Sequence, residues 1–208
     1  MKQITAGLFS VALLAMAAGS ASATVINFDD AYASLGNIGD PATYYSSSDG
    51  VTISGTYFGL VGGVGNGDPG NWQLAGTNGS AFLGCNQGDT CSPTFNFDSP
   101  ASNVSLDLGL SYGTTTTFTV SGYLNSTLVD SKTLTITDPN TATGTWGTFA
   151  LSGNVNKVVV STSGGDAYGV DNVVFNAGAA TPEPATWSVF AGGLGLMAAV
   201  AYRKRRVA

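Results

Sequence analysis

The feature that most constrains this chain is a period of two in its apolar residues between positions 94 and 175. In the segment 103–110, for example, every second residue is Val or Leu and the residues between them are polar or small. Successive side chains of a strand point to opposite faces, so this alternation predicts half-buried β-strands. Comparable runs, separated by turn residues, lie at 24–28, 51–58, 94–97, 115–124, 126–137, 146–151, 155–161 and 168–175. These eight to ten short strands predict an all-β fold, an antiparallel β-sandwich of jelly-roll type.

Two segments of this domain contain no strand pattern. A polar stretch with Gly36, Gly39 and Pro41 follows the first strand, and we expect a loop there. The segment 59–70 is so rich in glycine that we expect a surface loop without a regular element. Its Gly65-x-Gly67 spacing lacks the following Lys and helix of a phosphate-binding loop.

The charge of the predicted domain, 24–176, excludes one class of partner. Of the chain's 13 acidic residues, 12 lie in this segment, together with only two basic ones, Lys132 and Lys157, and the chain has no His. The net charge of the domain is therefore about −10, which would repel a polyanion. We expect no nucleic-acid binding, whereas cations, neutral polymers and sugars stay open as partners.

The N-terminal segment predicts export. Lys2 precedes an apolar run from Leu8 to Ala18, and Ala21 and Ala23 place small residues where a signal peptidase accepts them. Residues 1–23 are therefore interpreted as a signal peptide that is cleaved after Ala23.

The C-terminal segment predicts a membrane anchor. A linker, 177–186, precedes sixteen uncharged residues, 187–202, with Trp187 and Tyr202 at the ends where interfacial aromatic residues belong. We interpret 187–202 as a transmembrane helix, although about 20 residues are usual. The segment 203–208 begins with the basic residues that would keep this end in the cytoplasm: Arg203, Lys204, Arg205 and Arg206.

The tail as a whole resembles the PEP-CTERM sorting signal of Gram-negative bacteria. Pro182, Glu183 and Pro184 form its motif, followed by the apolar helix and the basic cluster, although position 181 is Thr where the family commonly has Val. The resemblance implies that exosortase, a membrane enzyme, recognises the tail and cuts near the motif. It also implies a link to exopolysaccharide and extracellular matrix. The chain would be anchored in the inner membrane before processing, and would then reach the cell surface or the exterior. A permanent single-pass anchor is the alternative.

The two cysteines, Cys85 and Cys91, lie close together in the sequence. After export they would meet an oxidising environment, so we predict a local disulfide. The alternative, a catalytic thiol, lacks the histidine that normally activates one.

The domain also loosely resembles jelly-roll modules with galactose-binding-like folds, through its first strand and its last, 166–175. In such modules a structural calcium ion joins an acidic residue near the first strand to one on the last. The resemblance thus implies calcium ligands at Asp29, Asp30 and Asp171, since carboxylate oxygens suit this ion. The alternative is that these residues only end a strand or face solvent.

Aromatic residues in or beside loops are candidates for sugar binding, because their rings can stack on pyranose units. They are Trp72, Tyr44, Tyr45 and Tyr112. The alternative for each is that it closes one end of the core.

Two hypotheses for the function follow. The first is a non-catalytic surface or matrix protein that is sorted by its tail and binds exopolysaccharide. We expect no enzymatic activity, because the domain has no His and no Arg to act as a base or to stabilise an anion. The second hypothesis is a secreted glycoside hydrolase or lyase that uses two Asp residues, although no spacing singles out a pair.

Overall fold

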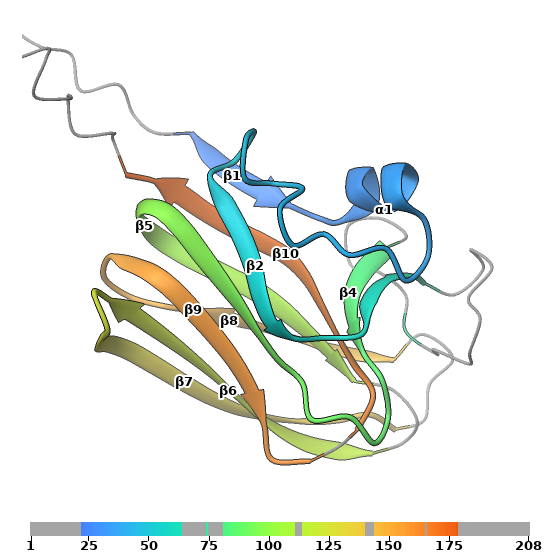
Figure 1. Cartoon of the computed structure of the whole chain (residues 1–208). Helices are drawn as coiled ribbons and strands as arrows, with labels where there is room; N and C mark the ends of the chain where they lie inside the picture. Colours follow the sequence, from blue (N-terminus) through green and yellow to red (C-terminus); the bar gives the residue numbers. More distant parts are fainter. Residues whose placement is uncertain are drawn as a thin grey trace, which may run out of the picture.

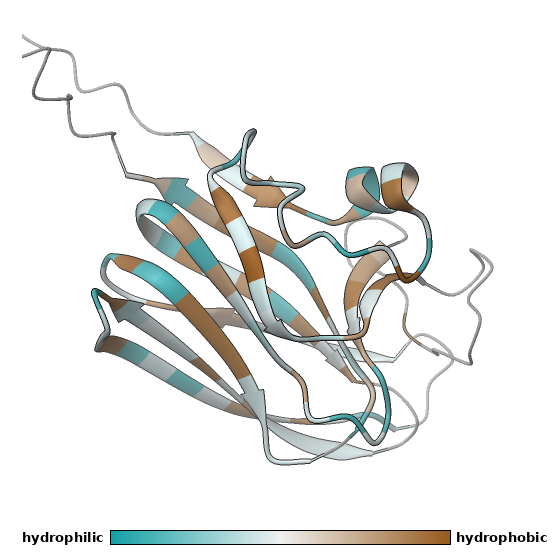
Figure 2. Cartoon of the chain, in the orientation of Figure 1, coloured by the Kyte–Doolittle hydropathy of each residue, from teal (hydrophilic) through white to brown (hydrophobic). Residues whose placement is uncertain are grey.

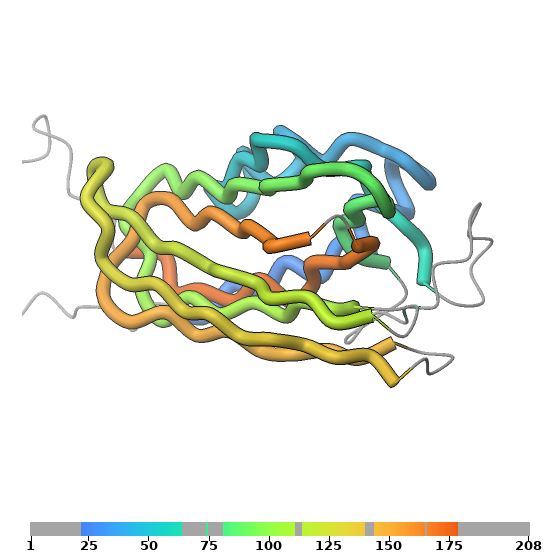
Figure 3. Tube along the Cα trace, turned by 90° about the horizontal axis from the view of Figure 1, so that it is seen from below, coloured from blue at the N-terminus to red at the C-terminus, as the bar shows by residue number. Residues whose placement is uncertain are grey.

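The computed structural model describes residues 22–63, 74, 81–110, 114–139, 144–164 and 166–178. Within these ranges the chain forms ten strands and one helix, α1 (Asp29–Leu35). Hydrogen bonds connect all ten strands, yet the strands form two layers because one long strand, β5 (Ser92–Leu110), belongs to both. Figure 1 shows the two layers, and Figure 3 shows from below that most strands run along the long axis of the domain.

The first layer, which we call the β6 sheet, contains the N-terminal half of β5. Its other strands are β2 (Val51–Thr56), β9 (Val155–Thr162), β6 (Thr115–Leu124) and β7 (Thr127–Thr137). The strand order is β2-β5-β9-β6-β7, and every pair is antiparallel.

The second layer, the β10 sheet, contains the C-terminal half of β5. Its other strands are β1 (Ala23–Ile26), β3 (Gly59–Gly62), β4 (Ala81–Cys85), β8 (Thr145–Ala150) and β10 (Tyr168–Ala177). The order is β3-β4-β10-β5-β8, with β1 also paired to β10. β5 changes layer at the Asp98–Pro100 bend, where its pairing with β9 shifts register. A proline suits this position because it cannot donate a ladder hydrogen bond.

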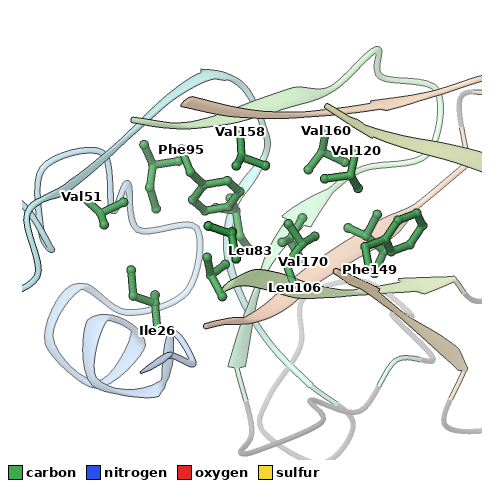
Figure 4. Close-up of a cluster of buried hydrophobic side chains, with 14 of the residues drawn as sticks. Ile26, Val51, Leu83, Phe95, Leu106, Val120, Phe149, Val158, Val160 and Val170 are labelled. Carbon is green, nitrogen blue, oxygen red and sulfur yellow. The ribbon is translucent and has the colours of Figure 1, made fainter. Parts of the chain in front are cut away.

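The core lies between the two layers. Figure 4 shows valines of β9 and β6 on one side, facing Leu83, Leu106 and Val170 of the β10 sheet. Val120, Val158 and Val160 are fully buried. The alternation in the sequence thus corresponds to one buried and one solvent-facing side of each strand, as predicted.

The all-β sandwich is confirmed, and most predicted strands are present within one to three residues. The runs predicted at 94–97 and 103–110 are parts of the single strand β5. β4 was not predicted as a separate strand.

The loop predicted with Gly36, Gly39 and Pro41 is confirmed, but two other segments without a predicted element contain one. Asp29–Leu35 forms the helix α1, because two aspartates in its first turn favour the positive end of the helix dipole. Gly59–Gly62 forms β3, since pairing with β4 and complete burial outweigh the weak strand propensity of glycine.

The first and last strands end side by side. Ala23 at the start of β1 pairs with Asn176 near the end of β10. Figure 1 shows the start of β1 and the end of β10 at the same end of the domain. The sorting motif, the predicted transmembrane helix 187–202 and residues 1–21 of the predicted signal peptide lie outside the described residues, whereas Ala23, the last residue of that predicted peptide, begins β1. Within those residues, no helix is long and apolar enough to cross a membrane.

Candidate functional site

Three of the predicted site residues, Asp30, Tyr44 and Tyr45, meet at α1 and the loop after it. The Tyr45 hydroxyl donates a hydrogen bond to Asp30 Oδ1 at 2.8 Å, and the Tyr44 hydroxyl donates to the Asp30 carbonyl at 3.2 Å. The two tyrosine rings contact each other edge to face, with centroids 5.0 Å apart. Burial, together with the Asp30 carboxylate, raises the pKa of Tyr45 far above its usual value. These contacts fix the loop after α1 to the helix.

The aromatic residues predicted for sugar binding are placed differently. Tyr45 is only 2% exposed and contacts Phe28 in the core, so it cannot present its ring to a sugar. Tyr44 is partly buried and packs against the same core. Trp72 and Tyr112 lie outside the described residues.

Asp171 lies in the middle of the β10 sheet, directly opposite Asp107 on β5. The pairing shifts register just after Asp171, and Asn172 has a positive φ of 47°, which marks a β-bulge. The bulge aims Asn172 Nδ2 at Asp107 Oδ2, to which it donates at 3.0 Å. Thr148 on β8 donates to Asp107 Oδ1 at 2.6 Å, and the Asn172 backbone N–H donates to Asp171 Oδ1 at 2.7 Å.

This network connects three strands, and sequence analysis missed Asp107 and Thr148. The alternation places Asp107 on the polar side of its strand, but only the strand pairing shows which residues face it. Asp171 is 0% exposed, so it does not face solvent.

The three aspartates predicted as calcium ligands do not form a ligand set in this structure. Asp29 Oδ1 accepts a hydrogen bond from the Ala81 backbone N–H at 2.9 Å, and Asp30 binds the two tyrosines described above. In the part of the chain that the structure describes, no group of three or more acidic, Cys or His residues is arranged to hold a metal ion. The resemblance to jelly-roll modules is the only basis for a calcium ion.

Cys85 and Cys91 form the predicted disulfide, with a sulfur–sulfur distance of 2.01 Å. Cys85 ends β4 in the β10 sheet, and Cys91 precedes the half of β5 that lies in the β6 sheet. The bond therefore connects the two layers. Both residues are buried.

A second, smaller apolar cluster covers the outer side of the β10 sheet. Leu74 lies over Gly109 and Gly169, where any larger side chain would meet it. Phe82 and Trp146 contact each other edge to face at the border of this cluster, with centroids 6.1 Å apart. Trp146 is thus a packing residue, and this side of the sheet is covered by the chain itself.

The outer side of the β6 sheet has a different character. On β6 the side chains of Phe118 and Val120 are buried, whereas Thr117 and Thr119 between them point outward. Four hydroxyl pairs join β6 to β7 across this side, with oxygen–oxygen distances of 2.8 to 3.2 Å. The pairs are Thr115–Thr137, Thr117–Thr135, Thr119–Thr133 and Ser121–Ser131. The pale colours along much of β6 and β7 in Figure 2 reflect these residues.

Cross-strand neighbours of these hydroxyl pairs continue the polar surface onto the other strands of this sheet. Lys157 and Ser161 on β9 lie beside Tyr123 and Thr119 on β6. Asn96 on β5 lies beside Lys157 on β9 and donates to Ser54 Oγ on β2 at 2.9 Å. We call this surface the hydroxyl face. It comprises the four pairs together with Thr52, Ser54, Thr94, Asn96, Tyr123, Lys157, Val159 and Ser161. Sequence analysis missed it, because the pairing of β2, β5, β9 and β6 cannot be read from alternation.

Comparison with known proteins identifies the tail. The family model of the PEP-CTERM protein-sorting motif matches residues 180–206. The chain therefore carries this motif at the position predicted from the sequence. No curated protein matches the chain.

Solved structures of carbohydrate-binding modules are similar to the chain at low identity. A mutant of the family 29 module CBM29-2, complexed with mannohexaose, is 10% identical with a TM-score of 0.38, and the match covers 74% of this chain and 90% of that one. TmCBM61, in complex with β-1,4-galactotriose, is 14% identical with a TM-score of 0.39, covering 65% and 94%. CBM35 from Paenibacillus barcinonensis is 17% identical with a TM-score of 0.34, covering 64% and 94%. Similarity at this level says nothing about a ligand of this chain.

Proposed function

We propose that this chain is a non-catalytic protein of the cell surface or the extracellular matrix, sorted by exosortase through its tail, and that its sandwich binds exopolysaccharide. The observation that carries the sorting proposal is the match of the PEP-CTERM motif at residues 180–206.

The position at which the folded domain ends supports this sorting route. β10 ends at Ala177, so only a short linker separates the folded domain from Pro182. An extended chain spans at most about 3.3–3.6 Å per residue, so the linker 177–186 reaches roughly 35 Å. A domain anchored at 187–202 would lie close to the membrane, with the motif between the two, where a membrane enzyme can reach it.

The surface chemistry supports a non-catalytic role. The domain is strongly acidic, and its two Lys residues are Lys132, which is paired with Asp130 at 3.3 Å, and Lys157, which lies over the Tyr123 ring. The Lys132 ammonium and the Ser152 hydroxyl both bind the Asp130 carboxylate, and the Lys157 ammonium contacts an aromatic ring. The outer side of the β6 sheet instead presents hydroxyl and amide groups, the groups with which proteins bind neutral sugars.

Mass spectrometry of the protein recovered from the surface of the producing cell tests the sorting. We expect a mature chain that begins at Thr24 and has lost Arg203–Arg206. The double variant Pro182→Ala/Pro184→Ala should retain the basic cluster and stay in the membrane fraction, because its backbone no longer has the fixed extended form. Thr181→Val, which restores the residue common in the family, is the matched control and should be processed normally. An intact basic cluster in the surface fraction of the unaltered chain would contradict the proposal.

The alternative function, an Asp-based glycoside hydrolase or lyase, has one structural observation in its favour: Asp107 and Asp171 face each other across neighbouring strands. Against it, Asp171 is fully buried, and a catalytic carboxylate must reach the substrate. We expect no release of reducing ends from the polysaccharide of the producing cell. Release that is lost in Asp107→Asn, but kept in Asp89→Asn, would establish the enzyme instead.

A further inference from the structure

The hydroxyl face differs from the rest of the domain in its charge. The domain carries twelve aspartates, yet none of those that the structure describes lies in the rows of this face. The nearest, Asp98, is exposed and follows Asn96 on the same side of β5, so it borders the face at the bend. β-propensity explains threonine on an exposed strand, but it does not explain why so acidic a domain places no carboxylate among the residues of this face.

The composition of the hydroxyl face excludes several occupants. A protein interface would need an apolar or aromatic centre, whereas this face offers Val159 and Tyr123 among its polar groups, with Leu128 opposite Tyr123 at its edge. A membrane surface would require an apolar side or a basic cluster, and neither is present. An anionic polymer would meet a domain with a net charge of about −10, and Lys157 is the one cation among the residues of the hydroxyl face.

The hydroxyl pairs retain binding capacity. In each pair one hydroxyl donates to the other, so one O–H donor and several acceptor lone pairs stay available to a ligand. The pairs recur at every second residue, so they repeat along the strand at about 6.6–6.8 Å. The Lys157 ammonium lies 4.7 Å from the centre of the Tyr123 ring, and within the described ranges it forms no ion pair, so its N–H groups can donate to sugar oxygens.

We infer that the hydroxyl face is the docking surface for an uncharged polysaccharide, which lies across β6 and β7 and exchanges hydrogen bonds with the hydroxyl pairs. An uncharged chain suffers no repulsion from the acidic domain, and its many hydroxyl groups match a surface that both donates and accepts. This inference rests on the proposed function and names the surface and the class of ligand.

The test compares three variants of the mature protein recovered from the producing cell. The first changes four central threonines to valine, which keeps their shape and strand propensity but removes the hydroxyls: Thr117, Thr119, Thr133 and Thr135. The second changes the same four residues to serine, which restores the hydroxyls. The third variant, a control, changes Thr24 to valine; Thr24 lies on β1 of the β10 sheet, outside the face. The probe is the exopolysaccharide of the producing cell, separated by anion exchange into uncharged and acidic chains, with binding measured by affinity electrophoresis.

We expect the unaltered protein to bind the uncharged fraction with little dependence on salt. The four-valine variant should bind about tenfold more weakly, which corresponds to about 1.4 kcal/mol. The four-serine variant and the control should bind within about twofold of the unaltered protein, a change of less than about 0.5 kcal/mol. Equal binding by the four-valine variant would overturn the choice of surface, and binding only to the acidic fraction would overturn the choice of ligand; the proposed function would survive both. Absence of binding to either fraction would overturn the inference and the polysaccharide part of the proposed function together.

Discussion

Reducing the Cys85–Cys91 disulfide should lower the free energy of unfolding by an amount that follows from the length of its loop. The bond closes a loop of seven residues, since the cysteines are six positions apart. The chain-entropy relation then gives about 2.4 kcal/mol at 25 °C from restriction of the unfolded chain. This is a large fraction of the roughly 5–15 kcal/mol by which a domain is usually stable.

The disulfide lies in the buried part of the domain, so substitutions of its cysteines change more than the entropy of the unfolded chain. Both cysteines are almost completely buried, at 1% and 4% exposure, and the Tyr168 hydroxyl donates to the Cys91 carbonyl at 3.3 Å. Reduction removes no heavy atom, so it measures the effect of the cross-link more directly than a substitution does. The double variant Cys85→Ala/Cys91→Ala also removes buried atoms and should lose more. Replacement by serine should cost more again, because two hydroxyls would be buried in an apolar environment.

Urea unfolding of the chain from Ser22 to Gly178, with and without a reductant, measures the difference. We expect a fall of about 2.4 kcal/mol on reduction, with a cooperative transition in both states. A difference below about 0.5 kcal/mol would refute the loop-entropy reasoning, because it would mean that the unfolded chain is not restricted by the bond. Free thiols in protein taken from the cell surface would refute the export argument as well.

Three further predictions concern the core and the pH dependence. Phe118→Ala should destabilise the domain by about 3–5 kcal/mol in urea unfolding, since the Phe118 ring is fully buried against Phe149 and Tyr168. A loss of less than about 1 kcal/mol would contradict this packing. Burial raises the pKa of Tyr168 far above its usual value, so this tyrosine ionises at lower pH in the unfolded chain, and the free energy of unfolding should fall by up to about 1.4 kcal/mol per pH unit above about pH 10. Tyr168→Phe should remove that part of the slope when urea midpoints are measured from about pH 8 to 11. An unchanged slope would contradict the role of Tyr168. Gly109→Val should lower the melting temperature and cost about 1–3 kcal/mol, because a Cβ there would lie 2.7 Å from the Trp146 ring, and an unaltered melting temperature would show that Trp146 moves aside freely.

The sequence predicted the architecture because the relevant interactions are local. Alternation along a strand determines which side is buried, so β6 was predicted with its observed bounds, Thr115–Leu124. The disulfide was predictable for the same reason, since two cysteines six positions apart lie within reach of each other after almost any turn. The sorting motif is linear, and it is recognised from Pro182, Glu183 and Pro184 without a fold.

Alternation, however, gives no information on which strands are neighbours. The pairing of β5 with β2, β9, β8 and β10 joins residues as far apart in the sequence as Ala101 and Ala177. Tertiary structure therefore decided every feature that depends on pairing. It buried Tyr45, placed Asp107 opposite Asp171, and turned Gly59–Gly62 into a strand. It also gathered scattered Thr and Ser residues into one face free of carboxylates. Which residues face inward is a property of each strand alone, but which residues meet is determined by the packing of the whole chain.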